Sequence, residues 1–202
     1  NTIDKMRADV QKASAQLRFY AGLGFEMKGD TIPASPGNLH LTLREPYGVV
    51  GRIIPFNHPI NFAASRLAPI LMAGNTLVEK PSEQSPLSTG ILAEIAAQVL
   101  PPGVLNIVTG RAEAGAALAR HPAVKRLAFT GSVATGLAVQ RAAAETTVKQ
   151  VSLELGGKNP MIVCADADID RATTDALDAS FGNSGQASMK IEPRRRAGQR
   201  RW

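Results

Sequence analysis

Asn57 is the first residue whose type and setting suggest chemistry. It stands between two prolines in the segment Pro55-Phe56-Asn57-His58-Pro59, directly after a β-rich apolar run that ends at Ile54. A side-chain amide held rigidly at the end of a strand could stabilise an oxyanion by donating a hydrogen bond. Asparagine is more often used to satisfy the backbone of a turn, so both interpretations stay open at this point.

Charged side chains follow two other apolar runs. Lys80 and Glu83 stand three residues apart, and an ammonium beside a carboxylate could bind ribose hydroxyls. Without other observations, a surface ion pair explains these two residues better. Glu154 ends a later run and precedes Gly156 and Gly157. Its carboxylate could act as a general base, or it could be a solvated charge at a strand end.

The segment from Gly131 to Gly136 has the composition of a phosphate-binding turn. It follows the apolar run 126–129 and opens a helical pattern, with the spacing G-S-x-x-x-G. Backbone N–H groups at a helix N-terminus attract an anion, and glycine lets the backbone come close to it. The spacing differs from the usual G-x-G-x-x-G, so an ordinary tight turn remains an alternative.

Histidine and cysteine do not form a metal-ligand pattern. His40, His58 and His121 are scattered, so we expect no metal site. The single cysteine, Cys164, permits no intrachain disulfide, which fits a reducing compartment, and we expect a cytoplasmic protein. Because Cys164 lies in the apolar run 161–164, we expect it to be a buried core thiol in a short strand.

Alternating elements are predicted to position these residues. Five short apolar strands alternate with helices between residues 49 and 155, which predicts an α/β fold with a parallel sheet and crossover helices. The carboxyl ends of such strands meet at one edge of the sheet, where ligands bind. The strands are expected at 49–54, 76–80, 104–108, 124–129 and 148–155. The helices are expected at 60–73 with a kink at Pro69, 85–100 with Ser85 as its cap, 112–120 and 133–144.

Two elements precede the predicted sheet. An amphipathic helix is expected over 3–20, and alternating leucines predict a half-exposed strand over 39–44. The apolar stripe of the helix consists of Ile3, Met6, Val10, Ala13, Leu17 and Tyr20.

Composition narrows the class of protein. The chain has 202 residues, 44% of them hydrophobic and 20% charged, as in an ordinary globular protein, and no apolar run is long enough to span a membrane. The net charge of +6 comes mostly from residues 190–202, which hold six of the 23 basic and one of the 17 acidic residues. A short basic tail can touch nucleic acid or anionic lipid, but the nearly neutral remainder leads us to expect neither nucleic-acid nor membrane partners.

Six motifs, taken in order, resemble the aldehyde dehydrogenase superfamily, and the resemblance covers about residues 3–189. They are P-F-N-H-P at 55–59, V-E-K-P-S-E-Q-S-P at 78–86, P-G-V-L-N-I-V-T-G at 102–110, F-T-G-S-V-A-T-G at 129–136, L-E-L-G-G-K-N-P at 153–160 and F-G-N-S-G-Q-A-S at 181–188.

The resemblance implies a variant Rossmann domain, NAD as cofactor, and oxidation of an aldehyde to a carboxylic acid through a thiohemiacetal and a thioester. Asn57 would be the oxyanion donor and Glu154 the base that activates the deacylating water. Lys80 and Glu83 would bind the adenosine ribose, and Glu83 would favour NAD because the 2′-phosphate of NADP would meet a carboxylate. The implied cofactor-binding residues are Ile53, Ile54, Pro55, Phe56, Lys80, Glu83, Gly110, Phe129, Gly131, Ser132, Thr135, Leu155 and Gly156.

The chain departs from the family at the nucleophile. The family pattern is G-Q-x-C, whereas Gly185-Gln186-Ala187 is followed here by Ser188, whose hydroxyl is far less acidic than a thiol. The family also uses an acidic residue beyond this region to orient the nicotinamide ribose. We therefore expect an impaired enzyme. A non-catalytic nucleotide-binding or oligomer-docking remnant and, less favoured, a basic-tailed nucleic-acid binder are the alternatives.

The expected organisation has three parts. Residues 1–160 would form the NAD-binding domain, with a bridging strand at about 38–46 used in oligomerisation, and 161–189 would begin the catalytic domain. The basic tail 190–202 matches nothing in the family, and the chain opens on Asn1 rather than methionine. These features lead us to expect a partial chain whose family-type homo-oligomer is weakened.

Overall fold

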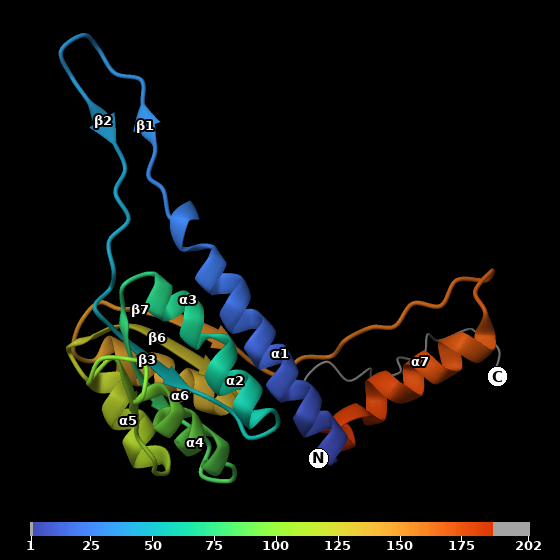
Figure 1. The fold of residues 1–202 in the computed structure, drawn as a ribbon. Coiled ribbons are helices and arrows are strands. Elements are labelled where there is room, and N and C mark those ends of the chain that lie inside the picture. Colours follow the sequence, from blue (N-terminus) through green and yellow to red (C-terminus); the bar gives the residue numbers. More distant parts are fainter. Residues whose placement is uncertain (1, 188–202) are drawn as a thin grey trace.

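A parallel sheet of five strands forms the centre of the computed structural model, which describes residues 2–187 (Figure 1). The strand order is β5-β4-β3-β6-β7, and all four pairings are parallel. This confirms the predicted α/β fold and its five strands. Their bounds are β3 Val49–Ile53, β4 Thr76–Lys80, β5 Leu105–Ile107, β6 Val124–Thr130 and β7 Gln150–Glu154.

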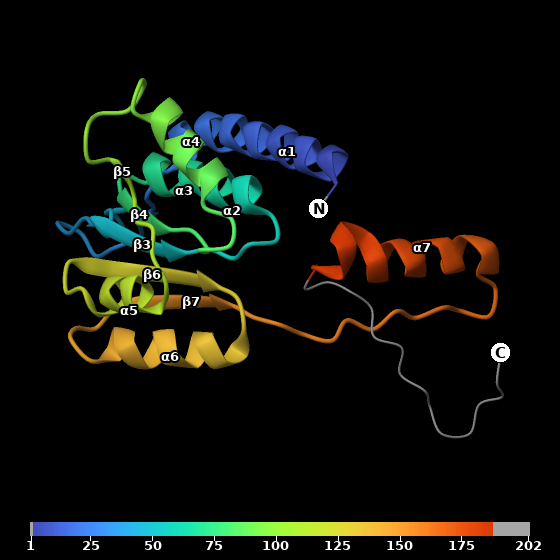
Figure 2. The ribbon, with the colours of Figure 1, turned by 90° about the horizontal axis from the view of Figure 1, so that it is seen from below.

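Helices cover both faces of the sheet (Figure 2). One face carries α1 (Ile3–Gly22), α2 (Pro59–Ser65), α3 (Leu67–Met72) and α4 (Leu87–Ala96). The other face carries α5 (Ala112–Arg120) and α6 (Val133–Ala144). Each face has its own apolar core. On the α5–α6 side, Leu127 and Phe129 of β6 pack with Val139, and on the other side Leu67 packs with Val50 and Leu77.

The segment predicted as one helix over 60–73 forms two helices, α2 and α3. The break falls at Arg66 rather than at Pro69. Proline has no backbone N–H, and its ring clashes with the carbonyl four residues earlier, which here belongs to Ser65. The helix therefore ends one turn before the proline that causes the break.

Ser85 does not cap the helix that follows it. The helix α4 begins at Leu87 with Pro86 at the N-cap position and no side-chain cap. The Ser85 hydroxyl instead donates to the carbonyl oxygen of Phe56, at 3.2 Å. This contact ties the start of α4 to the loop after β3, where Asn57 lies.

A long hairpin projects from the body of the molecule between α1 and β3 (Figure 1). After the short 3₁₀ turn η1 (Gly24–Glu26), the strands β1 (Thr31–Ile32) and β2 (His40–Leu41) pair in antiparallel fashion. The strand predicted over 39–44 is thus shorter than expected, and all residues from 31 to 48 are exposed. The leucine alternation has no buried face here, because no second layer of the described structure covers the hairpin.

The segment after β7 differs most from the prediction. Residues 161–164 form no strand, and Cys164 is exposed rather than buried. An extended stretch leads instead to a helix that the sequence did not predict, α7 (Ile169–Phe181), followed by the turn η2 (Gly182–Gly185). Asp168 caps α7 by accepting a hydrogen bond from the backbone N–H of Arg171, at 3.0 Å. Figure 2 shows α7 standing apart from the sheet and its helices.

The helix α1 has about the predicted extent, but the face of it that is buried differs from the predicted one. Ala13 is buried, whereas Val10 is 53% exposed and Asp9 is only 2% exposed. Asp9 lies one turn from both Met6 and Ala13, so it shares their face of the helix. No helix of the described residues is long and apolar enough to cross a membrane.

Candidate active site

The carboxyl ends of the parallel strands bring the predicted site residues to one edge of the sheet. Asn57 follows β3, Lys80 ends β4, Gly131 and Ser132 follow β6, and Glu154 ends β7. Three parallel registers align these ends, with Ile53 opposite both Lys80 and Phe129, and Thr130 opposite Glu154. Residues up to 97 positions apart in sequence therefore share one edge.

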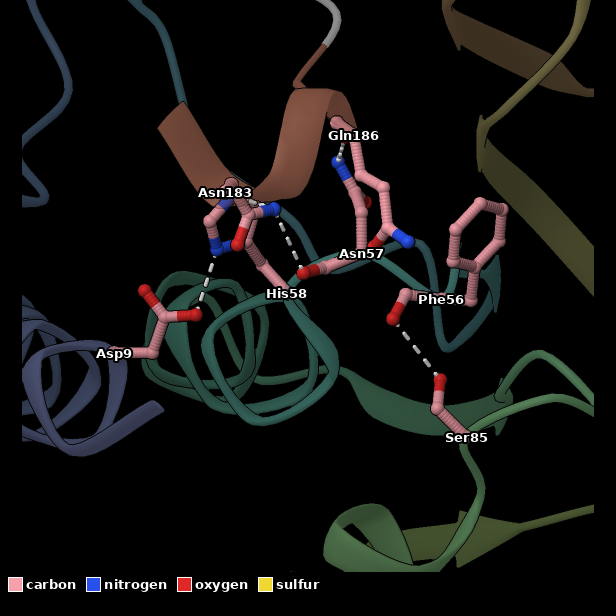
Figure 3. Close-up of polar contacts among 7 residues, drawn as sticks. All are labelled: Asp9, Phe56, Asn57, His58, Ser85, Asn183 and Gln186. Atoms are coloured by element: carbon pink, nitrogen blue, oxygen red, sulfur yellow. Dashed lines mark hydrogen bonds and ion pairs between the residues drawn. The ribbon is translucent and has the colours of Figure 1, made fainter. Parts of the chain in front are cut away.

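Asn57 is held in a network of polar contacts (Figure 3). Its Nδ2 donates to the carbonyl oxygen of Gln186 at 2.7 Å, and its own carbonyl oxygen accepts from Asn183 Nδ2 at 3.2 Å. The neighbouring Phe56 carbonyl is held by Ser85. The amide of Asn57 thus faces the segment that carries the G-Q-A-S motif, rather than only its own turn.

Lys80 is not a surface lysine. Its side chain is 6% exposed, and its Nζ lies 3.1 Å from the Pro81 carbonyl oxygen and 3.8 Å from Glu83 Oε2. Its alkyl chain packs against Gly115 of α5, where an added Cβ would lie 3.6 Å from the lysine Cδ. Glu83 is half exposed. The sequence favoured a surface ion pair between these two residues, but only Glu83 is at the surface.

The turn between β6 and α6 places Gly131 and Ser132 at the N-terminus of a helix, the location that the predicted phosphate-binding turn requires. The Ser132 side chain caps α6 by accepting from the Thr135 N–H at 3.2 Å, and Gly131 N–H donates to the Glu154 carbonyl at 3.0 Å. A Cβ on Gly131 would lie 2.5 Å from Cζ of the buried Phe129 ring. A side chain at position 131 would therefore have to displace this ring before the backbone could open the helix.

The remaining predicted residues surround the same edge. Ile53 and Ile54 are buried, and Ile54 N–H donates to the Lys80 carbonyl at 3.0 Å. Gly110 follows β5 with φ +142°, a conformation that side chains other than glycine rarely adopt. The carboxylate of Glu154 is exposed, whereas Leu155 packs on Gly136 of α6.

A buried pair of an arginine and a glutamate lies beneath this edge. Arg52 Nη1 donates to Glu79 Oε2 at 2.8 Å across the β3–β4 pairing, and it also donates to the Phe62 carbonyl at 2.9 Å. Burial raises the pKa of Glu79 to about 7, although the positive charge of Arg52 opposes this shift. Glu79 directly precedes Lys80 in β4. Arg52 lies near the end of β3, just before the loop that carries Asn57.

Sequence reasoning missed three residues beside Asn57. His58 Nδ1 lies 2.6 Å from Asp9 Oδ2, and His58 Nε2 lies 3.1 Å from Asn183 Nδ2 (Figure 3). The one available signal was Asp9, an acidic residue on the apolar face of α1. Ser188, predicted at the nucleophile position, lies outside the described residues, as does the tail. No group of three or more metal-ligating side chains occurs within residues 2–187.

The sheet order, the glycine turn before α6 and the polar groups at the carboxyl edge define a nucleotide-binding domain of the Rossmann-like class. The chain belongs to the aldehyde dehydrogenase family, whose family model matches residues 1–193.

Individual relatives agree with this assignment. The chain is 46% identical over 180 residues to mouse (Mus musculus) retinaldehyde dehydrogenase 3, covering 88% of this chain and 35% of the mouse protein. An NAD⁺ complex of aldehyde dehydrogenase from Bacillus cereus has 40% identity and a TM-score of 0.86, covering 90% of this chain and 37% of that one. An E. coli NADP-dependent enzyme has 38% identity and a TM-score of 0.87, covering 91% of this chain and 39% of that one. The chain thus spans little more than a third of these relatives' lengths.

Proposed function

We propose that this chain is the nucleotide-binding part of an enzyme that oxidises an aldehyde to a carboxylic acid with NAD. The observation that carries the proposal is the gathering of Asn57, Lys80, Ser132 and Glu154 at the carboxyl edge of one parallel sheet. In this proposal residues 1–160 form the NAD-binding domain and 161–189 begin the catalytic domain.

The residues present fit a dinucleotide. The ammonium of Lys80 is held almost fully buried beside the half-exposed carboxylate of Glu83, so a donor and an acceptor stand together as vicinal ribose hydroxyls require. The first N–H groups of α6 have no partner within the helix, and the exposed side chains of Ser132 and Thr135 lie beside them. A pyrophosphate would be held there by the backbone and the helix dipole. When bound, NAD supplies the hydride acceptor.

We assign the preference for NAD over NADP to Glu83. A 2′-phosphate on the adenosine ribose would bring a second negative charge next to this carboxylate. Solved relatives include both an NAD⁺ complex and an NADP-dependent enzyme, so the family alone does not decide the preference.

The catalytic roles follow from the same edge. The Nδ2 group of Asn57 is the oxyanion donor, and Glu154, exposed at the end of β7, is the base for the water that releases the acid. Position 188 is the nucleophile position, and the serine there makes this chain impaired, because its hydroxyl stays protonated near neutral pH. The aldehyde is the small-molecule partner, in a cytoplasmic enzyme.

Docking to a second copy is the second candidate function. The projecting hairpin exposes Leu39 and Leu43 by 71% and 76%, and no other element of residues 2–187 covers it. Such an uncovered hairpin fits an oligomer contact better than it fits a nucleic-acid site, since its leucines are exposed and its basic residues, Lys28 and Arg44, are balanced by Asp30 and Glu45.

Calorimetric titration of the chain with NAD tests the proposal. We expect binding, and we expect Lys80→Met to weaken it by about tenfold or more, the size of a lost charged hydrogen bond. Lys149→Met is the matched control, because Lys149 also donates to backbone carbonyls, those of Ala119 and His121, but directly precedes β7, at the other end of the strand from Glu154. Absence of NAD binding, or equal effects of the two variants, would overturn the proposal.

A further inference from the structure

We propose that Asp9 and His58 are positioning residues that hold Asn183, and through it the segment 182–187, against Asn57. The inference rests on the proposed function for its purpose, since that segment leads to the nucleophile position. Three distant parts of the chain meet here (Figure 3). They are α1, which supplies Asp9, the loop after β3, which supplies His58, and η2, which supplies Asn183, 125 residues beyond His58.

Asp9, His58 and Asn183 form a hydrogen-bonded relay, and their contacts determine which nitrogen carries each hydrogen. The side-chain atom of Asn183 that lies 3.2 Å from the Asn57 carbonyl oxygen must be the amide nitrogen, because a carbonyl oxygen can only accept. The same nitrogen lies 3.1 Å from His58 Nε2, which must therefore accept. A neutral imidazole with an accepting Nε2 carries its proton on Nδ1, and Nδ1 faces the carboxylate of Asp9 at 2.6 Å.

Burial makes the contacts of this relay costly to break. Asp9 is 2% exposed and Asn183 is 8% exposed, so neither can replace its partner by bulk water at little cost. An unpaired buried carboxylate is especially unfavourable, and His58 Nδ1 is the hydrogen-bond donor that lies against Asp9. The carboxylate therefore orients the imidazole, and the imidazole orients the amide of Asn183.

The backbone beyond α7 shows why such an anchor is needed. Asn183 and Ser184 have φ values of +56° and +57°, and Gly185 follows at +71°, so three successive residues are left-handed. Non-glycine residues keep this conformation only when their surroundings hold them in it. Asn183 is held by its amide contacts and by Gln186 N–H, which donates to its carbonyl at 3.1 Å.

The result is the placement of Gln186 against Asn57. With the left-handed turn held, the Gln186 carbonyl oxygen accepts from Asn57 Nδ2 at 2.7 Å, and this contact orients the amide assigned to the oxyanion. His58 acts through Asn183 and not on a substrate, because its Nε2 lone pair is already engaged. It is a positioning residue and not the general base that Ser188 would need.

Two variants of His58 separate its two contacts. In His58→Gln the side-chain oxygen can reach the place of Nε2 and accept from Asn183, whereas in His58→Asn the shorter amide reaches only the place of Nδ1 and can donate to Asp9. Hydrogen exchange of the 183–187 peptide, measured against peptides of β3 and β6, reports the order of the turn. Ser85→Ala is the matched control, since it removes the hydrogen bond to Phe56 on the other side of the same loop.

We expect His58→Asn to accelerate exchange of this peptide by about tenfold, as one buried hydrogen bond implies. His58→Gln should accelerate it less, because it keeps the bond to Asn183 and loses only the contact with Asp9, and Ser85→Ala should change it by less than about threefold. An equal rise in both His58 variants, or in Ser85→Ala, would overturn the proposal, as would no rise in His58→Asn. Nitrogen-15 spectra of the unmodified chain are a second test, requiring no variant. An Nε2-protonated neutral ring would contradict the relay. Both measurements are made without NAD or aldehyde, so their failure is distinct from failure of the proposed function.

Discussion

Glu79 shows how a single buried residue ties the stability of the sheet to pH. Its side chain is 1% exposed, it pairs with Arg52, and burial raises its pKa from 4.5 to about 7. The folded chain therefore holds this proton between these two values while the unfolded chain has lost it. The contribution of the protonated residue to stability is complete below the unfolded pKa and is lost as pH rises through the folded pKa.

We predict that the unfolding free energy falls between about pH 5 and pH 8, and that Glu79→Gln reduces this fall because glutamine does not titrate. Urea unfolding followed by circular dichroism at several pH values measures both curves. Glu94→Gln, an exposed change on α4, should keep the slope of the unmodified chain. A slope unchanged by Glu79→Gln would show that the buried glutamate is charged throughout this range.

Glu83 determines the prediction about cofactor choice. We expect NAD to bind more tightly than NADP, and we expect Glu83→Gln to narrow the difference by about two- to fivefold, a modest effect because the carboxylate is half exposed. Titration with each nucleotide gives the ratio, with Glu94→Gln again as the control. Equal or tighter binding of NADP by the unmodified chain would mean that Glu83 points away from the ribose.

At the scale of elements, close contacts decide where glycine is needed in a helix. Gly136 of α6 approaches the end of β7 so closely that an added Cβ would lie 2.6 Å from Leu155 Cδ2. Gly90 of α4 has no atom within 4 Å of the same position. Alanine is the better helix former by about 0.5–1 kcal/mol, so the two sites test packing against propensity.

We predict that Gly90→Ala stabilises the chain by about 0.5–1 kcal/mol and that Gly136→Ala destabilises it by about 1 kcal/mol, because overpacking exceeds the helix gain. Urea unfolding of the two variants side by side gives the comparison. If Gly136→Ala were as stabilising as Gly90→Ala, the contact between α6 and Leu155 would be too loose to matter.

The whole molecule exposes apolar surface on several elements. Leu87, Ile91 and Ile95 form a stripe along α4 with exposures of 81%, 57% and 55%, and Phe181 of α7 is 71% exposed. Contiguous exposed apolar surface promotes association. We predict that these 202 residues, expressed by themselves, form oligomers or aggregates in size-exclusion chromatography with light scattering.

Ile91→Lys, in the middle of this stripe, should shift the population towards monomer, whereas Glu94→Lys on the same helix should not. A monodisperse monomer that melts in one sharp transition would refute the prediction.

Catalysis is also a property of the whole molecule. We predict no aldehyde-dependent NADH production by this chain, because the proposed nucleophile position holds a serine, and little rescue by Ser188→Cys, because these 202 residues cover only 35% of the mouse relative. NADH absorbance with a panel of aliphatic and aromatic aldehydes is the assay. Clear turnover by the unmodified chain would show that Ser188 or another residue is a working nucleophile.

The sequence by itself determined the sheet and the residues at its edge. Apolar runs such as 76–80 end at prolines and glycines, and α6 begins and ends where its pattern predicted, at Val133 and Ala144. These signals are local, because periodicity and turn residues act within a few positions of the chain. Motif spacing then identified the family, and the domain limits and the cytoplasmic location stay predictions.

Only the tertiary structure decided what each side chain meets. The contact of Asp9 with His58 spans 49 positions and depends on how α1 is rotated against α2 and α3. Apolar periodicity placed the buried face of α1 one residue away, at Val10, which is exposed. Cys164 was predicted to be buried because its neighbours are apolar, yet burial depends on what covers a segment, and nothing among residues 2–187 covers this one. Lys80 shows the opposite case, since its polar sequence context suggested the surface and the packing of α5 buried it. Residue types and spacing act along the chain, whereas burial, hydrogen-bond partners and pKa shifts come from segments that folding brings together.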